Sequence, residues 1–211
     1  VINEIDADTT GFDTMEFIEL YDGGRGNTSL DNHVLVLFNG ADGGSHGAYA
    51  VIDLDGLSTD ASGFFLAANA DVPGIDDRVA SNTGIIYNTA LQNGEDGVGL
   101  YANTSASDIS TSSPKTQADE NLANLLDAVV YKTGGDRATT LITEFGLTGA
   151  SLDEAALGDK DTDSAGRITD GIGGLDLGAW QIYDTPTPGV KNNPAEEISA
   201  FLGQQSISEN G

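Results

Sequence analysis

The stretch Glu16-Phe17-Ile18-Glu19-Leu20-Tyr21 has the two-residue period of a β-strand. Ile18 and Leu20 fall on one face of such a strand, because successive side chains point to opposite sides. Phe17 and Tyr21 fall on the other face. A strand that is apolar on both faces needs a covering layer on each side, so we expect this segment to lie in a sheet whose two faces are both at least partly covered.

Similar short apolar runs recur along the chain between clusters of Gly, Asn and Asp, and the 28 Gly residues are spaced as turns require. The pattern predicts strands at residues 1–6, 16–21, 33–38, 48–54, 63–68, 85–88, 97–101 and 126–131. Trp180, followed by Ile182 and Tyr183, is expected to close the structure as its last strand. So many short strands indicate an all-β fold and favour a β-sandwich over a barrel.

Helical periodicity is confined to two short stretches, residues 116–125 and 139–147, which we expect to be connections at the rim of the sandwich. No shift in composition divides the chain. After Pro186-Thr187-Pro188-Gly189 the sequence becomes polar, and residues 195–202 form at most a short helix. The sequence therefore predicts one domain over residues 1–193 and a polar tail over residues 194–211.

Acidic residues outnumber basic ones by 34 to 8, which gives a formal net charge of −26. Such a chain repels phosphate backbones and anionic lipid, so we expect no direct binding to nucleic acid. The lack of Cys and the presence of only two His argue against redox, zinc and other transition-metal chemistry. No apolar run approaches the roughly 20 residues that a membrane-spanning helix requires, so we expect no membrane insertion.

The compartment is inferred from the start of the chain. Val1 already lies in a predicted strand, which we interpret as a mature exported protein, with a piece of a longer chain as the alternative. We therefore expect an extracellular or cell-surface location. High acidity is typical both of calcium-rich extracellular proteins and of proteins adapted to high salt, and composition does not separate the two.

The first two predicted strands also carry a family pattern. Val1-Ile2-Asn3-Glu4-Ile5-Asp6-Ala7-Asp8, followed by residues 16–21, resembles the opening of bacterial lamin tail domains, with its N-E-I and E-F-I-E-L patterns. The later motifs of the longer bacterial version follow in the expected order: Leu91-Gln92-Asn93-Gly94-Glu95-Asp96-Gly97-Val98-Gly99-Leu100-Tyr101, Leu126-Asp127-Ala128-Val129-Val130-Tyr131, Gly158-Asp159-Lys160-Asp161-Thr162 and Pro186-Thr187-Pro188-Gly189. The resemblance covers residues 1–192.

This resemblance implies an immunoglobulin-like β-sandwich that serves as an accessory module of secreted or surface-attached proteins, sometimes beside an extracellular nuclease or phosphatase domain. It carries over no catalytic residue and does not imply catalysis, so we expect that the chain is not an enzyme. Residues 102–124 lie outside the shared pattern. The resemblance therefore implies nothing about a partner surface there.

The strongest chemical candidate is the stretch Gly158-Asp159-Lys160-Asp161-Thr162-Asp163-Ser164-Ala165-Gly166-Arg167-Ile168-Thr169-Asp170. Three Asp at alternate positions can converge on one hard cation in a tight loop. Compared with the calcium pattern D-x-D-x-D-G-x-x-x-x-x-E, Ser164 replaces the turn glycine and Asp170 replaces the last Glu. We predict calcium as the cofactor. The predicted ligands are Asp159, Asp161, Asp163 and Asp170.

The alternative is an acidic surface turn whose charge Lys160 and Arg167 partly neutralise. Three further acid sets could complete a cation site from neighbouring loops, although such sets also arise by chance in a chain this acidic. They are Asp6, Asp8 and Asp13; Asp53, Asp55 and Asp60; and Asp71, Asp76 and Asp77. Two like charges about 4 Å apart repel by on the order of 1 kcal/mol in water and by several when partly buried, so we expect divalent cations to stabilise the fold.

Two sets of residues invite a catalytic interpretation: the strand carboxylates Glu4, Glu16 and Glu19, and the histidines His33 and His46 beside Ser29 and Ser45. Paired carboxylates are typical of glycosidases, but the chain has one Trp with which to line a sugar cleft. A serine hydrolase of the α/β type needs a G-x-S-x-G elbow, and the sequence has none. We interpret both sets as structural.

The sequence is compatible with three functions. The first is a non-catalytic extracellular structural or binding module, stabilised by calcium, that displays loops or docks a partner. The second is a self-assembling surface filament or lattice subunit, held by strand addition at a sheet edge and by calcium bridging. The third, which we do not expect, is a secreted hydrolase with metal-bound carboxylates. The expected partners are other proteins or further copies of the chain in a homo-oligomer.

Overall fold

The computed structural model describes residues 1–11, 13–41, 46–69, 71–72, 91–111, 124–134 and 138–192. The strands of this part of the chain are β1 (Ile2–Asp6), β2 (Phe17–Tyr21), β3 (His33–Asn39), β4 (Ala48–Asp53), β5 (Phe64–Ala68), β6 (Asp96–Ala102), β7 (Leu125–Lys132), β8 (Leu152–Asp153), β9 (Ser164–Arg167) and β10 (Trp180–Tyr183). The helices are α2 (Thr139–Phe145) and the short 3-10 helices η1 (Ala106–Asp108), η2 (Glu154–Leu157) and η3 (Leu177–Ala179).

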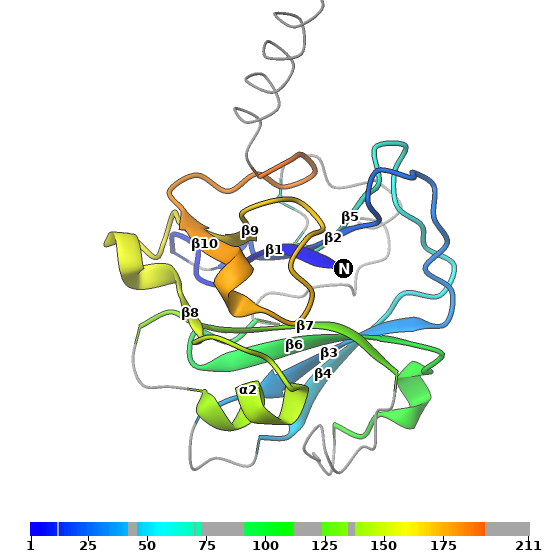
Figure 1. Ribbon diagram of the computed structural model, residues 1–211, viewed down its shortest axis with the longest axis horizontal. Helices are drawn as coiled ribbons and strands as arrows, with labels where there is room; N and C mark the ends of the chain where they lie inside the picture. Colours follow the sequence, from blue (N-terminus) through cyan, green and yellow to red (C-terminus); the bar gives the residue numbers. More distant parts are fainter. Residues whose placement is uncertain are drawn as a thin grey trace, which may run out of the picture.

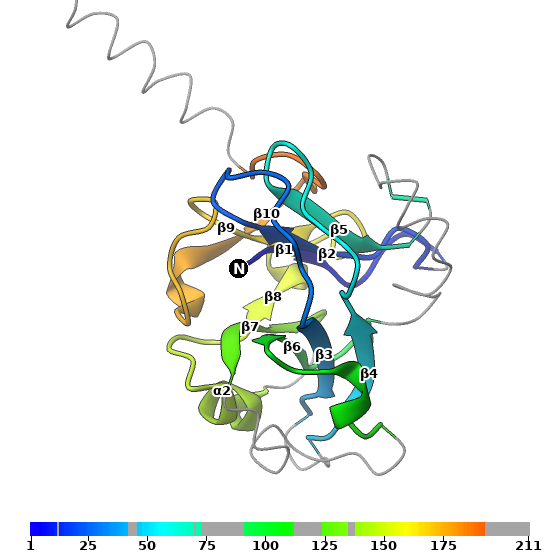
Figure 2. The ribbon, with the colours of Figure 1, turned by 90° about the vertical axis from the view of Figure 1, so that its right-hand side faces the viewer.

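The strands form two sheets that lie face to face as a β-sandwich (Figures 1 and 2). The first sheet has the order β10-β9-β1-β2-β5, and the second has the order β4-β3-β6-β7-β8. The pairs between named strands are antiparallel except for β7 with β8, which is parallel. The predicted all-β sandwich is therefore confirmed.

Every predicted strand that falls within the described residues is present, with ends that differ by at most one residue. The last strand at Trp180 and the helix predicted at residues 139–147 are confirmed as β10 and α2, but α2 packs on a face of the second sheet and not at the expected rim. The strand predicted at 85–88, nearly all of the helix at 116–125 and the short helix at 195–202 lie outside the described residues. Strands β8 and β9 were not predicted.

Strand β2 is buried on both faces, as its sequence predicted. Ile18 and Leu20 join the main core, which lies between the two sheets. Phe17 points to the outer face, where it joins a separate small apolar cluster with Leu66 and Val72. The outer face of the first sheet therefore carries a covering layer of its own.

The second sheet is covered on its outer side by α2 (Figures 1 and 2), which contacts β6 and β7. Phe145 of α2 packs edge-to-face on Phe38 of β3, with ring centroids 5.5 Å apart. Gly97 of β6 permits this approach, because a Cβ there would lie 3.0 Å from atoms of both Leu141 and Phe145. Helix α2 thus fits onto the sheet where β6 has no side chain.

Candidate functional site

The predicted calcium loop, residues 158–170, is interrupted by strand β9. Because a strand is extended, Asp163 and Asp170 lie beyond opposite ends of β9. The Asp170 carboxylate accepts hydrogen bonds from Asn3 Nδ2 (2.9 Å) and from the Asn192 backbone N–H (3.1 Å). Asp170 therefore belongs to a different part of the molecule from the acids that precede β9.

Asp159, Asp161 and Asp163 stay together in the turn before β9, but their surroundings differ. Asp159 is exposed, the half-exposed Asp161 contacts Lys160 Nζ (2.9 Å), and Asp163 is buried. In the part of the chain that the structure describes, no three or more His, Cys, Asp or Glu side chains are already grouped so as to hold a metal ion. The four predicted ligands therefore do not surround one point.

Asp163 lies near other buried carboxylates at the end of β1, which we call the β1-end cluster. The members of this cluster are Asp6, Asp8, Glu154 and Asp163, with exposed fractions of 5%, 4%, 0% and 2%. They come from the last residue of β1, the turn after it, the start of η2 and the residue before β9. Lys160 forms ion pairs with Asp8 Oδ2 of this cluster and with Asp161 Oδ1 outside it.

Three oxygens of the β1-end cluster have no hydrogen-bond partner within the described part of the chain: Asp6 Oδ1, Glu154 Oε2 and Asp163 Oδ2. The other Glu154 oxygen accepts the backbone N–H of Ala7 (3.1 Å). Burial raises the pKa of Asp6 to about 9 and that of Glu154 well above its ordinary range, and the charges of nearby carboxylates add to both shifts. At neutral pH the cluster therefore either keeps protons or requires a further cation.

Glu16, directly before β2, extends this environment. Its side chain is fully buried, and in the described structure neither of its carboxylate oxygens has a hydrogen-bond partner of normal geometry. Burial raises the pKa of Glu16 to about 8, although the nearby Leu91 N–H offsets part of the shift. Thr9 Oγ1 and Asn69 Oδ1 are also buried without a partner in the described residues, so the unpaired atoms found there near the end of β1 are oxygens.

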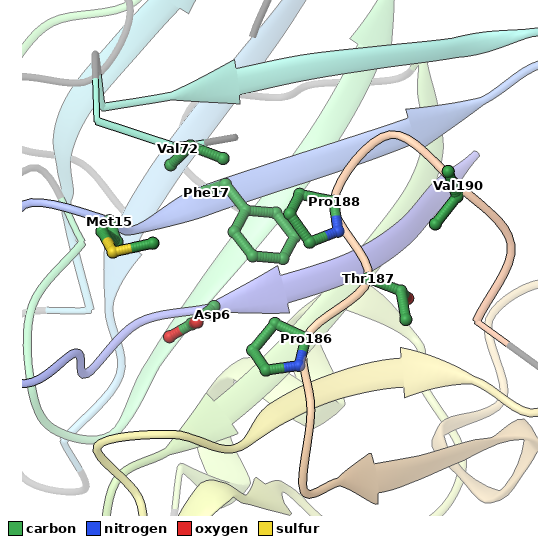
Figure 3. A pocket seen from close by; sticks show the side chains of 8 residues that line it. All are labelled: Asp6, Met15, Phe17, Val72, Pro186, Thr187, Pro188 and Val190. Carbon is green, nitrogen blue, oxygen red and sulfur yellow. The ribbon is translucent and has the colours of Figure 1, made fainter. Parts of the chain in front are cut away.

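Glu4 and Glu19 have a different role, because they hold the segment that crosses the outer face of the first sheet (Figure 3). We call this segment, residues 184–192, the strap. Glu4 Oε1 accepts the backbone N–H of Thr187 (2.9 Å), and Glu4 Oε2 accepts the Thr187 hydroxyl (2.8 Å). Glu19 Oε2 accepts the backbone N–H of Gly189 (2.7 Å). Burial raises the pKa of both carboxyls, and these hydrogen bonds partly offset the shift.

Two asparagines complete this network. Asn3 Nδ2 donates to Glu19 Oε1 (2.9 Å), and Asn192 Nδ2 donates to the carbonyl oxygens of Asn3 (3.1 Å) and Arg167 (3.0 Å). Residues of the first, second and last sequence motifs therefore meet in one hydrogen-bonded unit. The signal that could have indicated it is a Glu at an outward position of an otherwise apolar strand, such as Glu19 in β2.

A groove of about 370 Å³ opens beside the strap (Figure 3). Its lining is largely apolar and consists of Met15, Phe17, Val72, Pro186, Pro188 and Val190, with Asp6 and Thr187 as polar members. Met15 and Val190 are the more exposed of these side chains. Asp6 belongs both to the groove and to the β1-end cluster, so the two features adjoin.

The predicted His and Ser residues form no catalytic pair in the described residues. His33 begins β3, and its Nδ1 lies 2.9 Å from the carbonyl oxygen of Asp31. The Ser29 hydroxyl donates to the Asp31 carboxylate (2.8 Å). His46 is half-buried in the turn before β4, and Ser45 lies outside the described residues.

The remaining acid sets form turns. The carboxylates of Asp53, Asp55 and Asp60 accept backbone N–H groups of their own or neighbouring turns. Asp71 is exposed, while Asp76 and Asp77 lie outside the described residues. Trp180 is buried in the core with the Arg167 guanidinium 4.7 Å from its ring centroid, which is a packing role.

No protein-family model, curated protein or solved structure was found to match the chain. Among the described residues, no helix combines the length and the apolar character needed to cross a membrane. The site itself is therefore the basis for inferring function.

Proposed function

We propose that the protein is a non-catalytic structural or binding module of a secreted or cell-surface protein, with an immunoglobulin-like sandwich of the lamin tail kind that calcium stabilises. The observation that carries this proposal is the strap network. Glu4 and Glu19, the carboxylates best placed to suggest a catalytic pair, accept hydrogen bonds from the chain's own strap. A carboxylate held in this way beneath a covering segment has no free access to a substrate.

The calcium part of the proposal is supported by charge. The chain carries a net charge of −26, and the β1-end cluster buries four carboxylates, of which Asp8 pairs with Lys160. Divalent cations bind carboxylate oxygens and remove the repulsion between them. A protein of this composition is therefore expected to gain stability from calcium.

Thermal melting tests the proposal. Protein treated with a chelator is melted in moderate and in molar sodium chloride, and the series is repeated with millimolar calcium. A specific ligand stabilises the native state by about 2.7 kcal/mol at a hundredfold excess over its Kd. We expect calcium to raise the melting temperature in a way that sodium chloride cannot reproduce. If molar salt alone stabilises the fold and calcium adds nothing, the acidity is an adaptation to salt and the calcium part fails.

The non-catalytic part is tested separately. The purified protein is assayed against phosphodiester, phosphomonoester and glycoside substrates with calcium, magnesium and manganese, and no turnover is expected. A reproducible activity that Glu4→Gln abolishes while the variant remains folded would make the protein an enzyme.

A second candidate function, self-assembly, is favoured by the edge of the second sheet. In the described residues β4 pairs with β3 on one side and with no strand on the other. Tyr49, Ala50 and Val51 of β4 are only partly buried. Such an edge can accept a strand from another copy. Sedimentation at high protein concentration with and without calcium, followed by electron microscopy, distinguishes fibres or arrays from a monomer.

A further inference from the structure

We propose that the β1-end cluster, rather than the acidic loop as a whole, is the calcium site of this protein. Its ligands are the carboxylates of Asp6, Asp8, Glu154 and Asp163. This inference rests on the calcium part of the proposed function and gives that calcium a location.

The first reason is the unpaired oxygens. A buried carboxylate normally has its oxygens hydrogen-bonded, because an unpaired buried polar atom loses its hydration without compensation. Asp6, Glu154 and Asp163 each leave one oxygen without a partner among the residues that the structure describes, and all three side chains are more than nine-tenths buried. Glu154 accepts the N–H of Ala7, which lies between Asp6 and Asp8, and β9, which Asp163 directly precedes, pairs with β1. The three oxygens therefore belong to one region at the end of β1, where a bound cation would supply the partner that each lacks.

The second reason is the kind of donor present. The cluster offers carboxylate oxygens, without the nitrogen or sulfur that zinc or copper prefers. Calcium accepts irregular sets of six to eight oxygen ligands, whereas magnesium demands a near-octahedral site and keeps several waters. Glu16, Thr9 and Asn69, with their own unpaired oxygens, give the neighbourhood further oxygen donors. The irregular, oxygen-only environment favours calcium.

Lys160 is the competing cation in this arrangement. Its ammonium forms ion pairs with Asp8 and Asp161, and its side chain is 41% exposed. It can therefore move into solvent at little cost when calcium binds Asp8. Side-chain rotations must accompany this exchange, because no three acids among the described residues already surround one point.

The position of the proposed site also explains why the sequence pattern located it only in part. Asp163 belongs to both the predicted loop and the cluster, and Asp6 and Asp8 belong to one of the accessory acid sets. Glu154 lies 147 residues from Ala7, whose backbone N–H it accepts, so only the folded chain brings it to β1. Asp170 is engaged by Asn3 and Asn192 on the strap side.

Isothermal titration with calcium at pH 7.5 and physiological salt tests this assignment, on protein freed of metal by a chelator. Glu154→Gln and Asp8→Asn keep the side-chain size and remove one ligand charge each. Asp159→Asn and Asp170→Asn are the matched controls with the same change in net charge. We expect each ligand variant to weaken calcium binding by at least about tenfold, since loss of a mere supporting contact costs 10–100-fold in metal sites.

Lys160→Gln gives a second test that does not depend on a buried substitution. Removal of the competing ammonium should leave calcium affinity equal or raise it. Calcium binding that survives Glu154→Gln and Asp8→Asn in folded protein, or that falls equally in all four acid variants, overturns the assignment while leaving a calcium-stabilised module in place. If the wild-type protein neither binds calcium nor melts at a higher temperature with it, the calcium part of the proposed function fails as well.

Discussion

Arg167 and Asp127 form a fully buried ion pair that joins the two sheets. Arg167 Nη2 lies 2.9 and 2.7 Å from the two carboxylate oxygens of Asp127, and neither side chain has any exposed surface. Arg167 Nε also donates to the Ile2 carbonyl oxygen (2.7 Å), while the Ile2 N–H donates to Asp127 (2.8 Å). Burial raises the pKa of Asp127, and the guanidinium charge opposes that shift. The pair therefore ties β9, β7 and β1 together at one point.

Removal of one partner of this ion pair should lower the stability of the protein. Arg167→Met leaves the Asp127 carboxylate buried without a counter-charge, and we expect a loss of about 3–5 kcal/mol in the free energy of unfolding. Urea denaturation at pH 7 measures it. Lys132→Met is the control, because its partner Asp153 lies nearer the surface and the pair should contribute less than about 1 kcal/mol. Equal losses of stability in the two variants would show that burial of the Arg167–Asp127 pair does not increase the cost of removing one partner.

The strap should loosen when its carboxylates are changed. Glu19→Gln replaces one acceptor oxygen by a donor, so Glu19 can no longer satisfy both Gly189 N–H and Asn3 Nδ2. We expect a loss of about 1–3 kcal/mol in stability and earlier proteolytic cleavage in residues 184–192. Asp71→Asn, at an exposed position, is the matched control and should change neither. A cleavage pattern identical to that of the wild type would show that Glu19 does not hold the strap.

Stability should fall as the pH rises when calcium is removed. Burial raises the pKa of Asp6 to about 9, of Glu16 to about 8 and of Asp96 to about 7. The unfolded chain releases these protons near pH 4, so between that pH and the raised values the native state binds more protons and stability declines. The lowered pKa values of Asp22 and Asp31 act in the opposite sense, but only at more acidic pH.

Melting temperatures in chelator from pH 5 to pH 9 check this expectation, and the highest value should occur in the mildly acidic range. Saturating calcium should flatten the decline, because a bound cation stabilises ionised carboxylates. A melting temperature that climbs steadily to pH 8 in chelator would show that these carboxyls are ionised at little cost.

Two glycines with similar backbone angles should respond differently to alanine. Gly26 has φ +72°, and a Cβ there would lie 2.4 Å from the backbone oxygen of Ala61. Gly56 has φ +77°, with open space around the same position. Gly56→Ala should therefore cost only the left-handed conformation, about 1–2 kcal/mol, and Gly26→Ala should cost about 1–3 kcal/mol more. Chemical denaturation of both variants measures the difference. Equal losses of stability would show that the backbone at Ala61 moves away from the new Cβ at little cost.

Local periodicity was enough to locate most strands. In β2 apolar residues occur on both faces of the strand. Ile18 and Phe17 could therefore be assigned to opposite faces, and a covered outer face could be expected. Strand β9 was missed because Ser164-Ala165-Gly166-Arg167 has almost no apolar pattern and overlaps the acidic loop motif. Its strand conformation comes from pairing with β1 on one side and β10 on the other.

The candidate site was predicted less well than the strands. Their spacing in the sequence predicted that Asp163 and Asp170 share one loop, but the extended backbone of β9 separates them. Glu154 is not part of an alternating D-x-D-x-D pattern, so its spacing in the sequence does not suggest a metal ligand. Only the fold brings it to β1. Glu4 and Glu19 were rightly read as strand residues, yet their contacts with the strap lie 170 or more residues away in the sequence.

The amino-acid sequence by itself determined the strand segments, the all-β class and the large excess of acid, because these follow from local periodicity and composition. Only the tertiary structure decided which acids meet. The topology of the two sheets brings Asp6, Glu154 and Asp163 to one end of β1 and the strap over Glu4 and Glu19. Burial then gives different pKa values to carboxylates that look alike in the sequence. The free energy of a charged group depends on the water, dipoles and ions around it.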